Sequence, residues 1–221
     1  RFMHFINGFN QIFINSEDQV ISEKYAEIRK FLKDKKDGDM DTRDILTIKG
    51  LIRRGEARTA CTYNNIPLER CHFLDLPFYE TGKIQKNPIS EADVEIVRNL
   101  LREVKPHQIF VAGDLADPHG THRVCTDAVF AAVDLEKEEG AEWLKDCRIW
   151  MYRGAWAEWE IENIEMAVPI SPEELRAKRN SILKHQSQME SAPFLGNDER
   201  LFWQRSEDRN RSNTALYDSL G

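Results

Sequence analysis

The residues best suited to chemistry lie in one short segment, residues 114–123, which read DLADPHGTHR. His119 and His122 stand three positions apart, and this spacing turns both rings to the same side where a helix begins. Neutral imidazole is a common ligand of zinc, and a catalytic zinc takes about three protein ligands and keeps one position for water. Two histidines alone do not complete such a site, so capping of the following helix is the alternative interpretation of the pair.

Two aspartates accompany the histidines. Asp114 comes directly after the apolar run 109–113, and Asp117 stands three residues later. A carboxylate beside an imidazole orients the ring and raises its basicity, which favours a functional interpretation of both. Asp117 also precedes Pro118, and that pair is typical of a turn that enters a helix. The sequence therefore marks Asp114, Asp117 and His119 as catalytic candidates and leaves the turn interpretation open for Asp117.

The elements that must position this segment are two strands and a helix. The segments 71–77 (CHFLDLP) and 107–113 (HQIFVAG) are short and apolar, which predicts strands. Between them, Ser90 and Asp93 open a helix whose apolar spacing continues to residue 104. A strand, a helix and a strand at this spacing form a parallel unit with a right-handed crossover. The candidate segment would then lie at the carboxyl edge of a parallel sheet, where ligands of open α/β sheets bind.

The rest of the chain continues the α/β alternation. Apolar residues at helical spacing predict further helices, Ser171 with Pro172 and Glu174 is a strong helix start, and two more apolar segments predict strands. Without internal repeats or low-complexity linkers, residues 1–221 are predicted to form a single α/β domain with a mostly parallel sheet. The predicted helices are 20–34, 41–63, 121–134, 171–186 and a C-terminal helix within 197–221, and the predicted strands are 147–152 and 164–168.

Composition limits the classes of partner. The formal net charge is −7 and the pI is about 5.5, whereas a nucleic-acid backbone or an anionic membrane requires a basic face. No apolar stretch approaches the roughly 18 to 20 residues that cross a bilayer, and the N-terminus lacks the layout of a secretory signal. We therefore expect a cytoplasmic protein with no nucleic-acid or membrane partner. The four widely spaced cysteines predict reduced, mostly buried thiols rather than a disulfide framework or a zinc knuckle.

Several segments taken in order resemble one enzyme family. LIRRGEARTACTYNNIP, HFLDLP, IFVAGDLA followed by DPHGTHR, and KRNSILKHQSQ are similar to the successive motifs of the PIG-L/LmbE family of metal-dependent N-deacetylases. The resemblance covers most of residues 41–190. It implies a Rossmann-like three-layer α/β sandwich, a zinc ion, and hydrolysis of the acetamido group of an N-acetylglucosamine-type sugar.

The resemblance also implies roles for individual residues. His122 would be a zinc ligand, and His119 would stabilise the oxyanion or protonate the leaving amine. Arg53 and Glu56, paired in an R-x-x-E pattern, would be substrate-binding residues, although an ordinary helical ion pair is the alternative interpretation. His185 would belong to a recurrent structural motif. The tryptophans could stack on a sugar, but packing is the interpretation that we favour: Trp143, Trp150, Trp156 and Trp159.

Two departures from the family pattern matter. The family commonly has aspartate before the zinc-binding histidine, and this chain has Thr121. The other zinc ligands and the general base of the family come from an HPDD-type motif after the first strand, and these 221 residues contain no His-Pro pair. The chain also begins with arginine. We therefore expect an N-terminally truncated domain that lacks its first strand or strands, holds an incomplete zinc site and is inactive alone.

Among relatives, the pattern is most similar to the domain that follows a glucosamine-6-phosphate deaminase (isomerase) module in bacterial fusion proteins. This implies an amino-sugar substrate, with an amino-sugar phosphate as the expected class, and a fused or associated deaminase-like domain. A homo-oligomer is left open. The first alternative is a non-catalytic regulatory or sugar-sensing domain attached to such a deaminase. The second is a nucleotidylyltransferase, whose histidines bind triphosphate at a helix N-terminus, although its motif reads H-x-G-H and here the order is HGTH.

Overall fold

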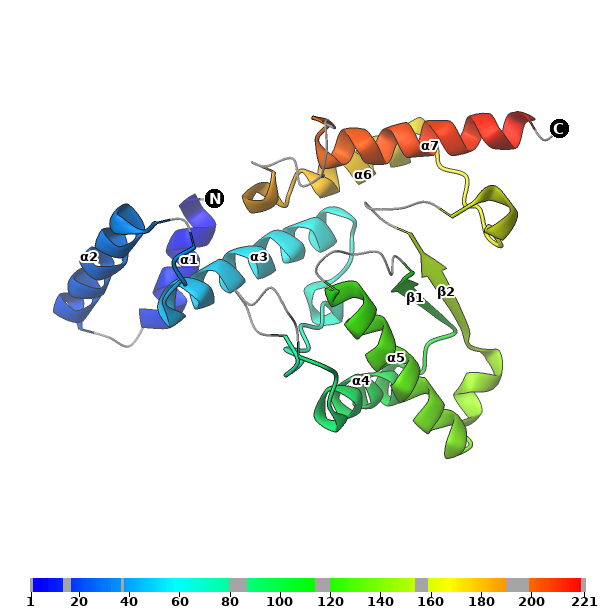
Figure 1. Ribbon diagram of the computed structural model, residues 1–221, viewed down its shortest axis with the longest axis horizontal. Helices are drawn as coiled ribbons and strands as arrows, with labels where there is room; N and C mark the ends of the chain where they lie inside the picture. Colours follow the sequence, from blue (N-terminus) through cyan, green and yellow to red (C-terminus); the bar gives the residue numbers. More distant parts are fainter. Residues whose placement is uncertain are drawn as a thin grey trace. The chain divides into compact units, whose positions relative to one another are not determined.

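The computed structural model describes residues 2–13, 17–36, 38–79, 87–113, 120–153, 159–189 and 199–219. Within these ranges the chain is rich in helices and contains one small parallel sheet (Figure 1). It divides into two compact units, each built from two stretches of sequence. The first comprises Arg1–His72 and Ile170–Glu207, and the second comprises Phe73–Pro169 and Asp208–Gly221.

The first unit is helical. Its core joins apolar residues of α1, α2 and α3, which recur at helical spacing, and α1 packs against α3. The sequence had not indicated α1, whereas α2 and α3 confirm the helices predicted at 20–34 and 41–63. The core residues are Phe9, Phe13, Ile28, Ile45 and Ile48. The helices are α1 (Phe2–Phe13), α2 (Asp18–Asp34), α3 (Arg43–Tyr63), α6 (Pro172–Ile182) and the beginning of α7 (Phe202–Ser219).

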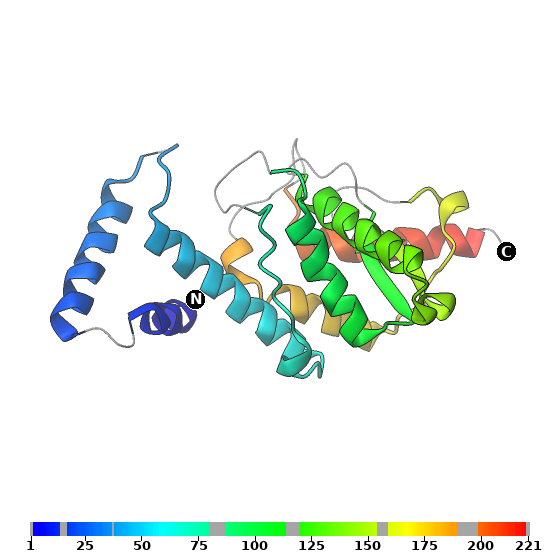
Figure 2. The same cartoon turned by 90° about the horizontal axis from the view of Figure 1, so that it is seen from below.

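The second unit holds the sheet. Strands β1 (Gln108–Ala112) and β2 (Arg148–Tyr152) pair in parallel, with Gln108 opposite Arg148 and Ala112 opposite Tyr152. Helix α5 (Thr121–Glu138) connects them and packs against α4 (Glu91–Val104). Figure 2 shows these two helices side by side. Their shared core consists of Val94, Val97, Leu101, Ala128 and Ala132.

Two predicted strands are wrong. Residues 71–76 are irregular, with Asp75 at a φ of +50°, and they join no ladder among the described residues. The parallel unit is therefore β1–α5–β2, one element later than predicted. Residues 164–168 follow a 3-10 turn at Ile161–Asn163 and form no described strand. Val168 there is 69% exposed, so the burial that would stabilise a strand is missing.

Asp93 fixes the start of α4. Its side chain is fully buried, and its carboxylate accepts hydrogen bonds from the Phe78 N–H at 2.9 Å, the Ser90 N–H at 2.8 Å and the Ser90 hydroxyl at 2.5 Å. This is the capping box that the sequence predicted, with one further donor from the preceding segment. Burial alone would raise the pKa of Asp93, but these hydrogen bonds outweigh it and lower the pKa.

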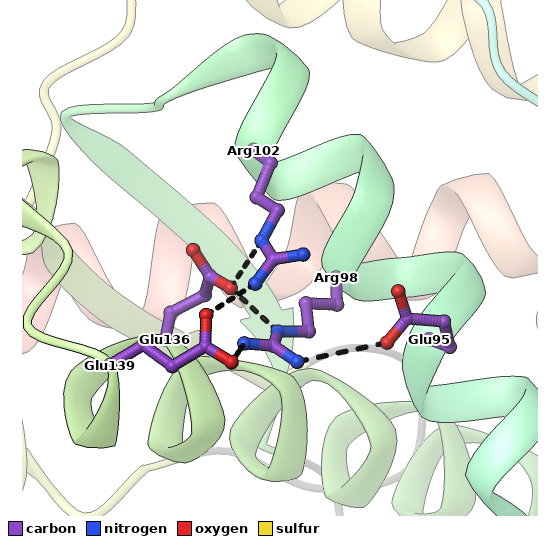
Figure 3. Close-up of polar contacts among 5 residues, drawn as sticks. All are labelled: Glu95, Arg98, Arg102, Glu136 and Glu139. Carbon is purple, nitrogen blue, oxygen red and sulfur yellow. Dashed lines mark hydrogen bonds and ion pairs between the residues drawn. The ribbon is translucent and has the colours of Figure 1, made fainter.

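A cluster of charges joins α4 to α5 (Figure 3). Glu136 is 3% exposed, and its Oε1 lies 2.6 Å from Nε of both Arg98 and Arg102. Glu139 extends the cluster, with its Oε2 2.6 Å from Nη2 of Arg102. Burial would raise the pKa of Glu136, but the hydrogen bonds from the two arginines prevail and lower it. The cluster thus ties the two helices that flank β1 in the sequence.

Candidate functional site

The site predicted from the sequence lies where β1 ends and α5 begins. Beyond the last paired residue of β1, the Gly113 N–H donates to the Tyr152 carbonyl at 2.7 Å and prolongs the contact with β2. On α5, the Thr126 hydroxyl donates to the Ala112 carbonyl at 2.7 Å. These two bonds fix the end of the strand against both its neighbour and the helix. The carboxyl end of β1 is thereby held beside both β2 and α5.

Gly113 permits a close approach at this edge. A Cβ atom there would lie 3.0 Å from Met151 Cβ and 3.0 Å from Cζ2 of Trp159. The indole of Trp159 donates to the Met151 carbonyl at 2.9 Å, and the Arg153 guanidinium lies 4.1 Å from its ring centroid. Trp159 therefore packs against the strand ends, in line with the interpretation favoured for the tryptophans. Trp156 lies outside the described residues.

The first turn of α5 carries the described part of the DPHGTHR segment. Gly120, at the N-cap, has a φ of +66°, a left-handed conformation that glycine adopts without steric cost. Thr121 is half-buried and His122 is exposed. The other candidates of this segment, Asp114, Asp117 and His119, lie outside the described residues.

The described residues do not by themselves fit a zinc site. Nowhere among them do three or more histidine, cysteine, aspartate or glutamate side chains come together as metal ligands. His122 offers a single exposed imidazole, and one nitrogen donor is short of the three protein ligands of a catalytic zinc.

Arg53 and Glu56 occupy successive turns of α3 but differ in environment. Arg53 is exposed, whereas the Glu56 side chain is fully buried. The Glu56 carboxylate accepts hydrogen bonds from the Ser187 N–H at 2.7 Å and from the Ser187 hydroxyl at 2.6 Å. In the described part of the chain no ion pair joins Arg53 to Glu56, so the pairing expected from the R-x-x-E pattern is replaced by the contact with Ser187.

Sequence reasoning missed Ser187 as the partner of Glu56. The residue stands within KHQSQ, in a 3-10 turn at Gln186–Gln188 that follows α6, where the sequence predicted the end of a longer helix. A polar segment after an amphipathic helix is a weak signal for a specific contact. The separation of 131 residues gives no local spacing that could indicate it.

Three further contacts set the direction of this segment along α3. The Asn64 side-chain amide donates to Ser181 Oγ at 2.7 Å, the Asn180 amide donates to the Tyr63 hydroxyl at 3.0 Å, and Lys184 Nζ lies 4.7 Å from the Tyr63 ring centroid. From the end of α3, the chain therefore returns toward Glu56.

Comparisons with known proteins agree with the resemblance. Residues 31–133 match the PIG-L family, described as GlcNAc-PI de-N-acetylase, and this range contains the candidate residues of both α3 and the DPHGTHR segment. The whole chain is 93% identical over 221 residues to a protein of Bacteroides thetaiotaomicron named as glucosamine-6-phosphate deaminase-like. The chain spans 33% of the length of that relative. No solved structure matches the chain.

None of the helices in the described ranges is both long enough and apolar enough to span a membrane.

Proposed function

Because residues 31–133 match the PIG-L family, we propose that the chain is part of a metal-dependent amidohydrolase domain that deacetylates an N-acetylglucosamine-type sugar. In this reaction water adds to the acetamide carbonyl carbon, the C–N bond breaks, and acetate and a free amine form. The family match over the segment that holds the candidate residues is the observation that carries the proposal.

The proposal assigns His122 as one zinc ligand. The exposed position of its imidazole on the first turn of α5 supports this role, because a ligand at a helix start can face a site beyond the strand end. The remaining ligands would come from outside the described residues. A bound zinc ion would supply polarisation of the carbonyl and a water of lowered pKa.

His119 would act on the leaving group, since an imidazole can donate a proton to the departing amine or a hydrogen bond to the oxyanion. Asp114 and Asp117 would orient the histidines through their ring N–H groups. Arg53, exposed on α3, would bind the sugar through its guanidinium. Glu56, with no exposed surface, would act through its hydrogen bonds to Ser187 rather than contact the substrate through its carboxylate.

A sugar phosphate is the substrate that we propose within this class. The name of the Bacteroides relative supports it, and so does the exposed Arg53, since guanidinium groups bind phosphate oxygens in pairs. We also propose a cytoplasmic protein in which a deaminase-like region is fused to this domain, and a Rossmann-like three-layer sandwich as the architecture of the complete domain.

A non-catalytic, sugar-sensing domain is the second candidate. Thr121 favours it, because the family commonly has a carboxylate at this position to orient the zinc-binding histidine. Under this hypothesis the sugar binds and is released unchanged.

A protein of the full length of the Bacteroides relative allows a decisive test. We expect the wild type to contain zinc and to release acetate from N-acetylglucosamine 6-phosphate. His122→Ala should lose the metal, and His119→Ala should keep it while turnover falls by about 10² or more. Equal metal loss in both variants would contradict the separate roles. A protein that binds the sugar without metal and without acetate release would support the sensing domain instead.

A further inference from the structure

Two carboxylates are fully buried among the described residues, and only one of them has a local structural role. Asp93 caps α4, as its bonds to Ser90 and Phe78 show. Glu56 lies in the interior of α3, where no helix end needs a cap, and its hydrogen-bond partner, Ser187, is 131 residues away. Burial of a carboxylate costs several kcal/mol unless hydrogen bonds compensate it, and an apolar side chain often stabilises such a position at least as well. Stability alone therefore does not account for Glu56.

The effect of Glu56 is to hold one segment in place. It binds both the backbone N–H and the hydroxyl of Ser187, so the main chain itself is fixed. The contacts of Tyr63 and Asn64 with α6 and Lys184 set the direction of the chain, which runs back along α3. Arg53 precedes Glu56 by three residues, about one turn of α3, so it is a neighbour of Glu56 along the helix.

The side chains near this contact on α3 and on the 3-10 turn are of types that can bind a sugar. Arg53 and Gln188 are exposed, and His185 is half-buried at the start of the 3-10 turn. A guanidinium, an amide and an imidazole supply donors and acceptors that suit hydroxyl and phosphate oxygens. These groups would bind one ligand together only if the turn at 186–188 is fixed relative to α3. Mobile side chains lose conformational entropy when they bind, and this loss weakens the affinity.

We propose that Glu56 is a positioning residue: through Ser187 it fixes the turn at Gln186–Gln188 beside α3, so that Gln188, His185 and Arg53 form one binding face for the hydroxyl and phosphate groups of an amino sugar. This inference rests on the proposed function and assigns the subsite that recognises the sugar rather than its acetamide. It predicts that a change at Glu56 affects substrate binding more than turnover.

The test compares Glu56→Gln with a matched control, Asp93→Asn, in a protein of the full length of the Bacteroides relative. Both changes replace a fully buried carboxylate with the isosteric amide, and the control lies in the other unit. We expect Glu56→Gln to raise KM for N-acetylglucosamine 6-phosphate about tenfold or more, with kcat within about twofold. Hydrogen exchange of the Ser187 amide should become faster. Asp93→Asn should leave KM and this exchange rate unchanged.

Changes at Ser187 separate positioning from folding. Ser187→Thr keeps the hydroxyl and should retain the wild-type KM, whereas Ser187→Ala removes one of the two bonds to Glu56 and should raise KM by less than Glu56→Gln. If Glu56→Gln does not fold, the comparison of KM between Ser187→Thr and Ser187→Ala tests the proposal by itself. An unchanged KM despite faster exchange at Ser187 would overturn the proposal, as would an equal rise of KM in Asp93→Asn.

A failure of the positioning role can be distinguished from a failure of the proposed hydrolase function. If the wild type releases no acetate, the hydrolase proposal fails, and calorimetric binding of N-acetylglucosamine 6-phosphate then replaces KM. Weaker binding by Glu56→Gln, with normal binding by Asp93→Asn, would still support the positioning role. Equal binding by both variants, or no binding by the wild type, would overturn it.

Discussion

At the scale of single residues, Gly113 has little room for an added atom. A Cβ there would approach both Met151 and Trp159 to 3.0 Å, and neither contact is with the far end of a flexible chain. We expect Gly113→Ala to lower the free energy of unfolding by about 1–3 kcal/mol, the usual cost of overpacking. Chemical denaturation monitored by tryptophan fluorescence measures the change.

Gly50→Ala is the matched control. The same methyl group at Gly50 meets no atom within 4 Å, and the residue lies inside α3. Alanine is a better helix former than glycine, so we expect the free energy of unfolding to rise by up to about 1 kcal/mol. A loss of stability at Gly50 equal to that at Gly113 would show that crowding is not the cause.

Glu136 makes stability depend on pH. Its pKa in the folded chain is lowered from 4.5, because the hydrogen bonds from Arg98 and Arg102 outweigh the effect of burial. The stabilisation is therefore fully present above about pH 4.5 and is lost as the pH falls through the folded-state pKa. We expect Glu136→Gln to melt at a lower temperature than the wild type at pH 7, and the two melting temperatures to converge as the pH falls from about 6 to 3.

Melting followed by circular dichroism across this range provides the measurement. Because other carboxylates also titrate here, among them Asp93, the difference between the two proteins is the informative quantity rather than either curve. A constant difference at every pH would mean that the charge on Glu136 contributes nothing.

The candidate residues show which parts of a site a sequence can predict. His122 was identified by its type, its spacing from His119 and its place after an apolar strand, and the structure does place it at the start of α5. The burial of Glu56 and its bonds to Ser187 could not be predicted, because a contact between residues so far apart depends on how α3 and α6 pack. Spacing within one helix suggested Arg53 as the partner, and the long-range contact prevailed.

At the scale of elements, the two capping boxes differ in burial. At α4, Asp93 is fully buried and also binds the Phe78 N–H, whereas at α6 both Ser171 and Glu174 are exposed. We expect Asp93→Ala to cost about 1–3 kcal/mol, since it leaves a buried donor unsatisfied. Ser171→Ala should cost about 1 kcal/mol. Urea denaturation of both variants gives the comparison, and equal costs would contradict the role assigned to burial.

Elements that carry their own start signals were predicted well. Ser90 with Asp93, and Ser171 with Pro172, mark helix starts that the structure confirms. The strand predicted at 71–77 failed for a different reason: an apolar segment becomes a strand only if another strand offers hydrogen bonds, and no spacing within the segment reveals this. The strand predicted at 164–168 was wrong for the same reason. Helix α1 was not predicted, because its short amphipathic segment carries no clear capping residue in the sequence.

At the scale of the whole chain, the four cysteines are free thiols, as predicted, but the expectation that most of them are buried is wrong, because Cys125 is exposed and the other three are half-buried: Cys61, Cys71 and Cys147. We therefore expect the unfolded protein to react with four equivalents of a thiol reagent, and the melting temperature to be the same with and without reductant. A higher melting temperature after mild oxidation would indicate a stabilising disulfide and contradict this expectation.

The division of the first unit into two distant stretches of sequence has a consequence for synthesis. Its α3 leaves the ribosome well before the turn that binds Glu56, whereas α4, β1, α5 and β2 follow one another without interruption. Because closing a long loop costs more chain entropy than closing a short one, the nascent chain should assemble the sheet first and complete the contact with Ser187 last. Until then the Glu56 carboxylate remains in water, so stalled or prematurely terminated chains would expose it.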